Sequence, residues 1–355
     1  MSATLTTTIM EPVSSLLSGT ATKKEEATEE PYKYAHLMPV YSQDKYPPLE
    51  PFEHVDPGSR ALSHANPRSF LDGGNVVELT PEFGSDVRGV NLATLTPDQK
   101  DQLALEVARR GVIVFRDQED FIDRGAGFYQ DWGRHFGRLH MHPTSGHPEG
   151  FPYIHLIYKD ANSKYNDQGL TSIISPSSCN PPGLTTFFLL AQPKTGGDTL
   201  YSSQVLNFRS LSPVMQNFLR TLKAMHTGVD SLRATKGGAR RREPIETVHP
   251  VVRRHPVTGV EALYVNKQFT RSIVGMKKEE SDLLLNFLYD HIAKAGDHQA
   301  RIKWEPMSMA LWDNRVTAHT ATVDFGHLKS RRHGARITPQ AERPIPANAS
   351  MKMDD

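Results

Sequence analysis

The stretch ALWDNRVTAHTATVDFGHLKSRRHGARIT, residues 310–338, decides how the fold of this chain is interpreted. Its apolar start reads as a strand, and His319 follows at a strand end. Arg332 and Arg336 come later in the same stretch. A planar guanidinium can hold a carboxylate through two hydrogen bonds, a contact that lysine cannot reproduce. The stretch therefore contains a candidate metal ligand followed by two candidate anion-binding side chains.

A second informative stretch, TSIISPSSCNPPGLTTFFLLAQPKTGGDTLYSS, covers residues 171–203. Its apolar run LTTFFLLA is far shorter than the roughly 18 residues needed to cross a bilayer, so we interpret it as a buried strand. The two glycines of TGGDT predict a tight turn just before Thr199. The part before PPG contains neither a histidine nor a carboxylate, and no histidine occurs between His155 and His226.

The composition limits the classes of function. The 355 residues suit one large domain or two modest ones, and 37% hydrophobic residues allow a sizeable core. The chain has 41 Lys and Arg residues and 40 Asp and Glu residues, so its net charge gives no reason to expect binding to a nucleic acid or an anionic membrane. Cys179 is the single cysteine, so an internal disulfide is excluded. The N-terminus resembles neither a secretory signal nor a transit peptide, and we expect a cytoplasmic protein.

The pattern along the chain predicts four parts. Residues 1–30 form a disordered N-terminal segment rich in Ser, Thr, Ala and Glu, and residues 31–75 form a Pro-rich extension. Residues 76–345 form the main domain, and residues 346–355 form a tail. The basic stretch KGGARRREP, residues 236–244, is interpreted as a solvated loop, because no aromatic residue interleaves its charges.

Local signals predict many strands and a few helices. Thr96 and Pro97 open a helix that Gly111 ends. Two further helices are expected over residues 213–226 and, from apolar residues at helical spacing, over residues 277–294. Many strands with a few covering helices favour a closed or double-sheet β core.

Six segments in a fixed order carry a resemblance to a known family: GVIVFRDQ, HFGRLHMHP, PKTGGDTLYSS, HPVVRRHPVTG, ALYVN and WDNRVTAH. They resemble the taurine dioxygenase-like (TauD/TfdA) family, in particular its fungal sulfonate dioxygenase-like branch. The resemblance implies a mainly β fold with α, a double-stranded β-helix (jelly-roll) core with covering helices. It also implies a dioxygenase that uses Fe(II), 2-oxoglutarate and O2 on a small anionic organic substrate such as an organosulfonate.

The resemblance also implies roles for five residues. His319 matches the distal iron ligand, Arg332 and Thr199 match the residues that hold the far carboxylate of 2-oxoglutarate, and His142 and Arg336 match those that grip a sulfonate. For each there is a structural alternative: a buried core histidine, a simple turn, or an arginine in an ordinary ion pair.

The remaining iron ligands do not appear where the resemblance places them. The family carries Trp-His-x-Asp before PPG, whereas this chain has IISPSSCN, shorter by about four residues. Cys179 is a soft ligand that suits Fe(II) poorly beside the expected histidines and carboxylate. The pairs His54–Asp56 and His147–Glu149 have the right spacing but the wrong places. We therefore predict that this chain binds iron poorly and is inactive or nearly so.

Several alternatives stay open at this point. The missing pair could reflect a misread exon boundary, a splice form without activity, or a protein that has lost turnover. The chain could accordingly be a catalytically inactive binding or scaffold protein. A third reading keeps the chemistry but replaces the sulfonate by a non-sulfur acid such as an aryloxyacid. Ser145, where bacterial taurine dioxygenases place a tyrosine, speaks against taurine itself. Association into a homo-oligomer is expected from the family alone.

Overall fold

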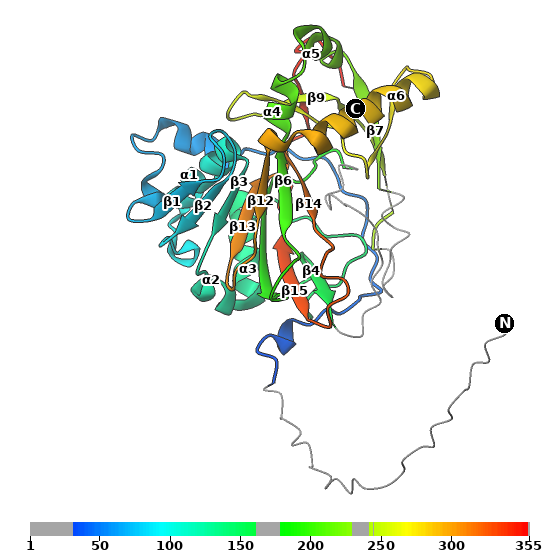
Figure 1. Cartoon of the computed structure of the whole chain (residues 1–355). Coiled ribbons are helices and arrows are strands. Elements are labelled where there is room, and N and C mark those ends of the chain that lie inside the picture. The colour runs from blue at the N-terminus through cyan, green and yellow to red at the C-terminus, as the bar shows by residue number, and fades with distance from the viewer. Residues whose placement is uncertain (1–30, 161–177, 229–240, 244, 354–355) are drawn as a thin grey trace, which may run out of the picture. The chain divides into compact units, whose positions relative to one another are not determined.

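The computed structural model describes residues 31–160, 178–228, 241–243 and 245–353. The chain divides into two compact units, Met1–Ala35 and His36–Asp355, and the second unit is described below. Its core consists of a large and a small sheet (Figure 1). In spatial order the large sheet contains β1 (Asn75–Glu78), β2 (Ser85–Arg88), β3 (Val112–Phe115), β13 (Met309–Asp313), β5 (Leu184–Ala191), β15 (Arg332–Ile337) and β4 (Ile154–Lys159). The small sheet contains β12 (Gln299–Ile302), β6 (Thr199–Ser203) and β14 (Thr317–Ala321).

Strand β5 shows how the core is built between these layers. Neighbouring side chains on a strand point to opposite faces of its sheet. Phe187 faces the small sheet and packs on Trp304, with ring centroids 5.2 Å apart. Phe188 faces the other way and packs on Tyr129, with centroids 4.9 Å apart. Because both faces are covered, seven of the eight β5 residues are buried, and the expected double-sheet β core is confirmed.

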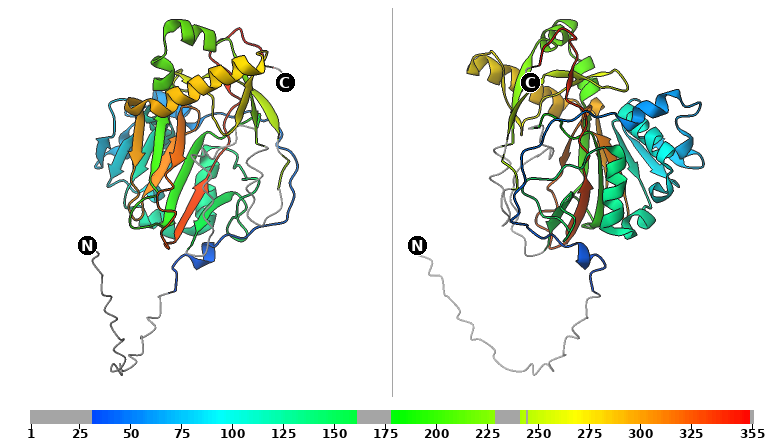
Figure 2. Two further views of the ribbon diagram at one scale, coloured as in Figure 1. Left: turned by 45° about the vertical axis from the view of Figure 1, so that its right-hand side comes forward. Right: turned by 180° about the vertical axis from the view of Figure 1, so that it is seen from behind.

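In the described part of the chain, six α-helices and several 3-10 turns surround the sheets. Tyr129 belongs to α3, and α1 and α3 cover the face of the large sheet that points away from the small sheet (Figure 2). The α-helices are α1 (Pro97–Arg110), α2 (Glu119–Asp123), α3 (Gly125–Phe136), α4 (Gln204–Arg209), α5 (Pro213–Leu219) and α6 (Lys278–Lys294). The 3-10 turns are η1 (Ala35–Leu37), η2 (Pro57–Ser63), η3 (Ser69–Leu71), η4 (Leu92–Thr94) and η6 (Gly296–His298).

Helix α1 begins and ends as its sequence predicts. Thr96 and Gln99 form a reciprocal capping box, and Gly111 ends the helix with φ 74°. A Cβ atom on Gly111 would lie 2.4 Å from the ring of Phe83, so both the backbone conformation and the packing require glycine.

The helix expected over residues 213–226 is shorter than predicted. It ends at Leu219, and Lys223–Thr227 form β7 instead. Strand β7 pairs with two neighbours, so tertiary strand pairing outweighs the local helix propensity. This sheet has the order β11 (Thr270–Ile273), β7 and β8 (Glu246–Pro250), and another has the order β10 (Glu261–Leu263), β9 (Val252–Arg254) and β16 (Ile345–Pro346).

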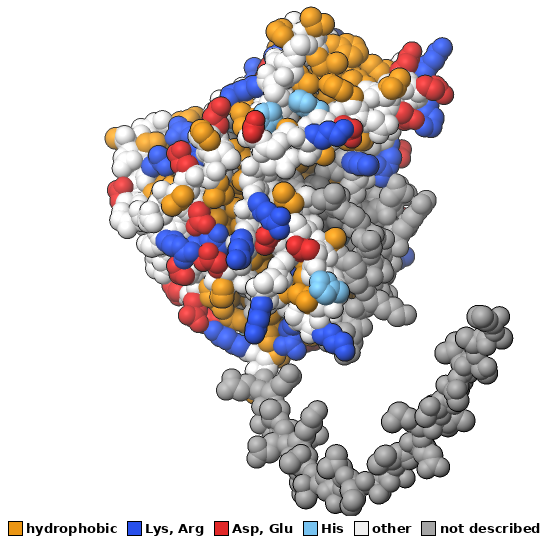
Figure 3. Space-filling view, in the orientation of Figure 1, with side chains coloured by type: hydrophobic (Ala, Val, Ile, Leu, Met, Phe, Trp, Pro, Cys, Tyr) orange, Lys and Arg blue, Asp and Glu red, His pale blue; other side chains and the backbone are white. Residues whose placement is uncertain are grey.

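Apolar side chains are exposed on two neighbouring helices at the top of Figure 3. They are Val214 and Phe218 of α5 and Leu283 and Phe287 of α6, with Leu283 74% exposed. Within the described part of the chain, none of the helices has the length and apolar character to cross a membrane.

Candidate anion and metal site

Two arginines of β15 form the centre of the site. Arg332 and Arg336 share one face of the strand because they are an even number of residues apart. They are 5% and 3% exposed, and the Nε atom of each is buried without a hydrogen-bond partner. Burial lowers the pKa of Arg332 to about 10 and that of Arg336 to about 9, so both remain charged at neutral pH. Neither forms an ion pair with a described carboxylate. A buried charge without a counter-ion is costly, so the arrangement favours bound anions.

Arg332 lies against a turn and two aromatic rings. Its Nη2 donates to the carbonyl of Gly197 at 3.4 Å, and its guanidinium lies 5.4 Å from the ring centroid of Phe325 and 5.9 Å from that of Phe187. Gly197 has φ 76°, and a Cβ atom there would lie 3.3 Å from Arg332 Nε. The TGGDT turn therefore both bends the chain and leaves room for the guanidinium.

Thr199 begins β6 directly after this turn. Its Oγ1 accepts a hydrogen bond of 3.1 Å from Trp304 Nε1. Because that contact uses only an oxygen lone pair, the hydroxyl proton of Thr199 can still be donated to a ligand. Trp304 in turn packs on Phe187, beside which Arg332 lies. Thr199 and Arg332 thus border the same aromatic pair from two strands.

Arg336 contacts a histidine that the sequence did not single out. It lies between His155 of β4 and Phe187 of β5 in the strand register, and its Nη2 donates to His155 Nδ1. The His155 ring packs on that of His142, with centroids 4.2 Å apart. Burial, followed by the charge of Arg336, holds the pKa values of both histidines well below their usual range. The structure therefore brings Arg336 and His142 together through His155, which could be recognised only once the register of β4 and β15 was known.

His319 lies on β14, directly opposite Tyr201 of β6. Its ring centroid is 5.7 Å from that of Tyr201 and 4.7 Å from that of Trp312. Its Nδ1 and the Tyr201 hydroxyl are both buried without a hydrogen-bond partner. Burial, with a smaller contribution from Arg336, lowers the pKa of His319 to about 3. The imidazole is therefore neutral, which is the form that binds metals.

The sheet around His319 has an open edge. The last four core strands alternate between the sheets, with β12 and β14 in the small sheet and β13 and β15 in the large one. Of the three core strands before them, β4 and β5 belong to the large sheet and β6 belongs to the small sheet. A jelly roll has eight strands, and the described residues provide seven of them. Among the described residues, no strand pairs with β14 on the side away from β6.

A cavity of about 50 Å³ lies next to this edge. Both polar side-chain atoms of Gln204 are buried there without a hydrogen-bond partner. The volume exceeds what one water molecule requires, so the space beside β14 is only partly filled. Described residues that line it include Pro181, Pro182, Gln204, Asn314, Thr317 and Ala318.

The described residues do not complete a metal site at His319. Among them, one group of His, Cys, Asp and Glu side chains is close enough to share an ion, namely His54, Asp56 and Glu342. His319 is not part of that group. The two carboxylates of the group, Asp56 and Glu342, already form ion pairs with Arg315. An iron(II) centre of two imidazoles and a carboxylate therefore does not fit these side chains.

The remaining candidates near the expected ligand pair have structural contacts. The Asn180 side chain donates to the carbonyls of Phe52 and Ala341 at 3.0 and 2.8 Å and accepts from Phe52 N. It thereby anchors the chain that enters β5. His147 Nδ1 contacts the carbonyl of Pro148 at 2.7 Å. The segment 161–177, between His147 and Asn180, lies outside the described part of the chain.

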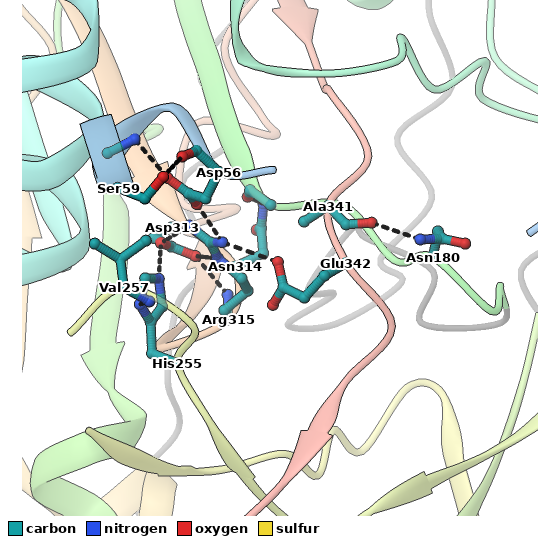
Figure 4. Close-up of polar contacts among 12 residues, drawn as sticks. Asp56, Ser59, Asn180, His255, Val257, Asp313, Asn314, Arg315, Ala341 and Glu342 are labelled. Carbon is teal, nitrogen blue, oxygen red and sulfur yellow. Dashed lines mark hydrogen bonds and ion pairs between the residues drawn. The ribbon is translucent and has the colours of Figure 1, made fainter. Parts of the chain in front are cut away.

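A buried ion-pair cluster fixes the WDNR turn between β13 and β14 (Figure 4). Arg315 pairs with Asp313, Asp56 and Glu342, and Asp313 also contacts His255 Nε2 at 3.0 Å. Burial alone would raise the pKa of Asp313, but Arg315 and His255 outweigh it and hold that pKa well below its usual range. The sequence did not predict this cluster, because its members lie far apart along the chain.

Of the basic stretch KGGARRREP only residues 241–243 are described, and they differ from the predicted solvated loop at one position: Glu243 is exposed and Arg242 partly exposed, whereas Arg241 is buried. Arg241 is 3% exposed. Its guanidinium donates to the carbonyl of Ser145, and its backbone N–H donates to the carbonyl of Pro143 at 2.9 Å. It is buried because it supports the loop that carries His142. Residues 236–240 and 244 lie outside the described part.

Comparisons with known proteins agree with this geometry. The taurine catabolism dioxygenase TauD, TfdA family matches residues 75–338. The chain is 39% identical to an alpha-ketoglutarate-dependent sulfonate dioxygenase of Saccharomyces cerevisiae, over 91% of this chain and 81% of that protein. It is also 39% identical to an alpha-ketoglutarate-dependent dioxygenase of Penicillium expansum, over 96% and 94%. A solved structure of a putative alpha-ketoglutarate-dependent taurine dioxygenase from Burkholderia xenovorans has a TM-score of 0.65 at 30% identity and covers 77% of this chain and 91% of that chain.

Proposed function

The chain belongs to the TauD, TfdA family of 2-oxoglutarate-dependent dioxygenases, and on this premise we propose how its interior site is used. Arg332 and Thr199 bind the far carboxylate of 2-oxoglutarate. Arg336 and His142 bind a small anionic organic substrate, for which an organosulfonate is the first choice. Among the described residues, His319 is the one expected iron ligand that is retained.

The observation that carries the proposal is the pair of buried arginines without carboxylate partners in the described chain. Two separate cations suit two separate anions, a cosubstrate carboxylate and a substrate acid group. The names of the relatives support this division, because they use alpha-ketoglutarate and the yeast protein is described as a sulfonate dioxygenase.

This chain lacks part of the iron site that the family's reaction requires. Enzymes of this class need Fe(II) to activate O2. The described side chains offer His319 alone, and the sequence contains no His-x-Asp pair before PPG. We therefore assign no reaction step to this literal chain and propose that it is impaired or inactive in dioxygenation.

A second candidate function follows from the same departure. A chain that keeps the fold and both arginines but lacks the ligand pair could serve as an inactive binding or scaffold protein. Iron content and 2-oxoglutarate decarboxylation distinguish the two, because only an enzyme shows both.

Three further points belong to the proposal. Residues 76–345 form the catalytic domain, between a Pro-rich extension (31–75) and a short tail (346–355), whereas the N-terminal segment 1–30, predicted from sequence to be disordered, lies outside the described residues. The protein acts in the cytoplasm. It self-associates, for which the exposed apolar side chains on α5 and α6 are the supporting observation.

The test is a titration of the unaltered chain with 2-oxoglutarate, followed by ligand-detected NMR, with succinamide as control. Succinamide has a similar carbon chain but no carboxylate. Saturable binding of 2-oxoglutarate that is roughly tenfold weaker in Arg332→Lys supports the proposal. Equal binding of both compounds, unaffected by that substitution, contradicts it.

A further inference from the structure

Resting on the proposed function, we propose that His155 is a third anion-binding side chain and sets the charge that the substrate site accepts. With His142 and Arg336 it forms a subsite of hydrogen-bond donors that carries one positive charge. Such a subsite suits a singly charged tetrahedral group, a sulfonate or a sulfate monoester. Three properties of the subsite support this role: the His155 tautomer, the His142 tautomer and the net charge.

The first property is the position of the proton on His155. Its Nδ1 accepts a hydrogen bond from Arg336 Nη2, and a guanidinium can only donate. In the neutral ring the proton must therefore sit on Nε2. His155 is 8% exposed and lies across from Arg336 in the β4–β15 register, so the contact is held by two paired strands.

His142 has the same tautomer as His155. Its Nδ1 accepts from the backbone N–H groups of Thr144 at 3.3 Å and Ser145 at 3.1 Å. Its proton is therefore also on Nε2. Arg241 holds this turn by donating to the carbonyl of Ser145. Two adjacent imidazoles, tilted by 34° to each other, thus each keep an Nε2–H to donate to a ligand, and neither offers a free lone pair.

The subsite carries one net positive charge. Arg336 is the charged member of the subsite, because His142 and His155 are neutral when buried beside it. Within the described chain, no carboxylate pairs with Arg336. A sulfonate carries a single negative charge, which balances this guanidinium. A phosphate monoester carries about 1.5 to 2 negative charges at pH 7, so part of its charge would stay uncompensated.

The experiment measures affinity for 1-hexanesulfonate by calorimetry, with 2-oxoglutarate saturating, for the unaltered chain and two variants. His155→Phe keeps a ring but removes the donor, and we expect roughly tenfold to hundredfold weaker binding. His155→Gln places an amide N–H near the Nε2 position and should recover most of the affinity. His226→Phe removes another buried histidine, in the β11–β7–β8 sheet, and should leave sulfonate affinity unchanged. Hexyl phosphate should bind the unaltered chain more than about tenfold less tightly.

Each outcome decides the proposal. Equal sulfonate affinity in the unaltered chain and His155→Phe overturns the role of His155, while the proposed function stands. No sulfonate binding by the unaltered chain overturns both. Equal affinity for hexyl phosphate overturns the charge selection. If His155→Phe does not fold, long-range proton–nitrogen NMR of the unaltered chain decides: a protonated Nε2 that shifts with 1-hexanesulfonate supports the proposal, and a protonated Nδ1 or no shift contradicts it.

Discussion

His319 lies directly opposite Tyr201 where β14 pairs with β6, and each has a buried polar atom without a hydrogen-bond partner, Nδ1 of the imidazole and the phenol oxygen. On the other side of β14 the described chain provides no strand. Among the described residues, both arginines of the proposed anion site are therefore present, whereas the proposed metal site has one imidazole. The predictions below test both halves and the packing that holds them.

Restoring the ligand pair should restore the metal. The variant replaces residues 174–179 with a longer segment containing Trp-His-x-Asp and keeps Asn180, because Asn180 anchors the entry to β5. We expect iron binding close to one per chain, measured by anaerobic dialysis, since His319 would gain an imidazole and a carboxylate. His319→Ala in the restored chain is the control and should lose the iron. Absence of iron in the restored chain would mean that His319 is not a ligand position.

Arg332→Lys should weaken 2-oxoglutarate binding. Lysine keeps the charge but loses the planar two-point contact, and we expect roughly tenfold weaker affinity, corresponding to about 1.4 kcal/mol. Arg134→Lys is a matched control, because Arg134 is exposed and pairs with the exposed Asp131. Ligand-detected NMR titrations give both affinities. Equal losses in the two variants would contradict a specific role for Arg332.

Asp313→Asn should destabilise the fold. It removes the charge that balances Arg315 inside the cluster of Figure 4, where Asp313 is 1% exposed. Breaking a buried pair in this way costs about 3–5 kcal/mol of unfolding free energy. Asp282→Asn is the comparison, because its exposed pair with Lys278 should contribute less than about 0.5 kcal/mol. Urea unfolding measures both, and similar values for the two variants would contradict the account.

Stability should fall with decreasing pH in two stages. Burial depresses the pKa of histidines such as His226, so their contribution is complete above the unfolded value of about 6.5 and is lost below it. Asp313 and Glu342 also have depressed pKa values, so their contribution is lost below about pH 4. Urea unfolding between pH 3 and pH 8 should show both losses. Asp313→Asn should reduce the loss of stability below about pH 4. An unchanged dependence of stability on pH in that range would contradict the assignment of this loss to Asp313.

Local signals in the sequence predicted the elements that local forces determine. Thr96 and Gly111 marked the ends of α1 because capping involves neighbouring backbone groups. The LTTFFLLA run predicted β5 because a strand covered on both faces is apolar throughout. The helix predicted to reach residue 226 was wrong because β7 forms through pairing with distant strands.

The site could be predicted from sequence only in part. The family resemblance pointed to Arg332, Arg336, Thr199, His142 and His319, but their roles stay predictions. His155 was missed because its contact with Arg336 depends on strand register, which the sequence does not reveal. The Asp56–Arg315 pair was missed because its members are remote in the chain.

The most direct test of the central claim is anaerobic equilibrium dialysis of the unaltered chain against Fe(II), with 2-oxoglutarate present and its binding measured in parallel. The account predicts bound 2-oxoglutarate with iron far below one per chain. Iron close to one per chain would contradict it, because the ligands would then have to come from residues other than the His-x-Asp pair that this sequence lacks.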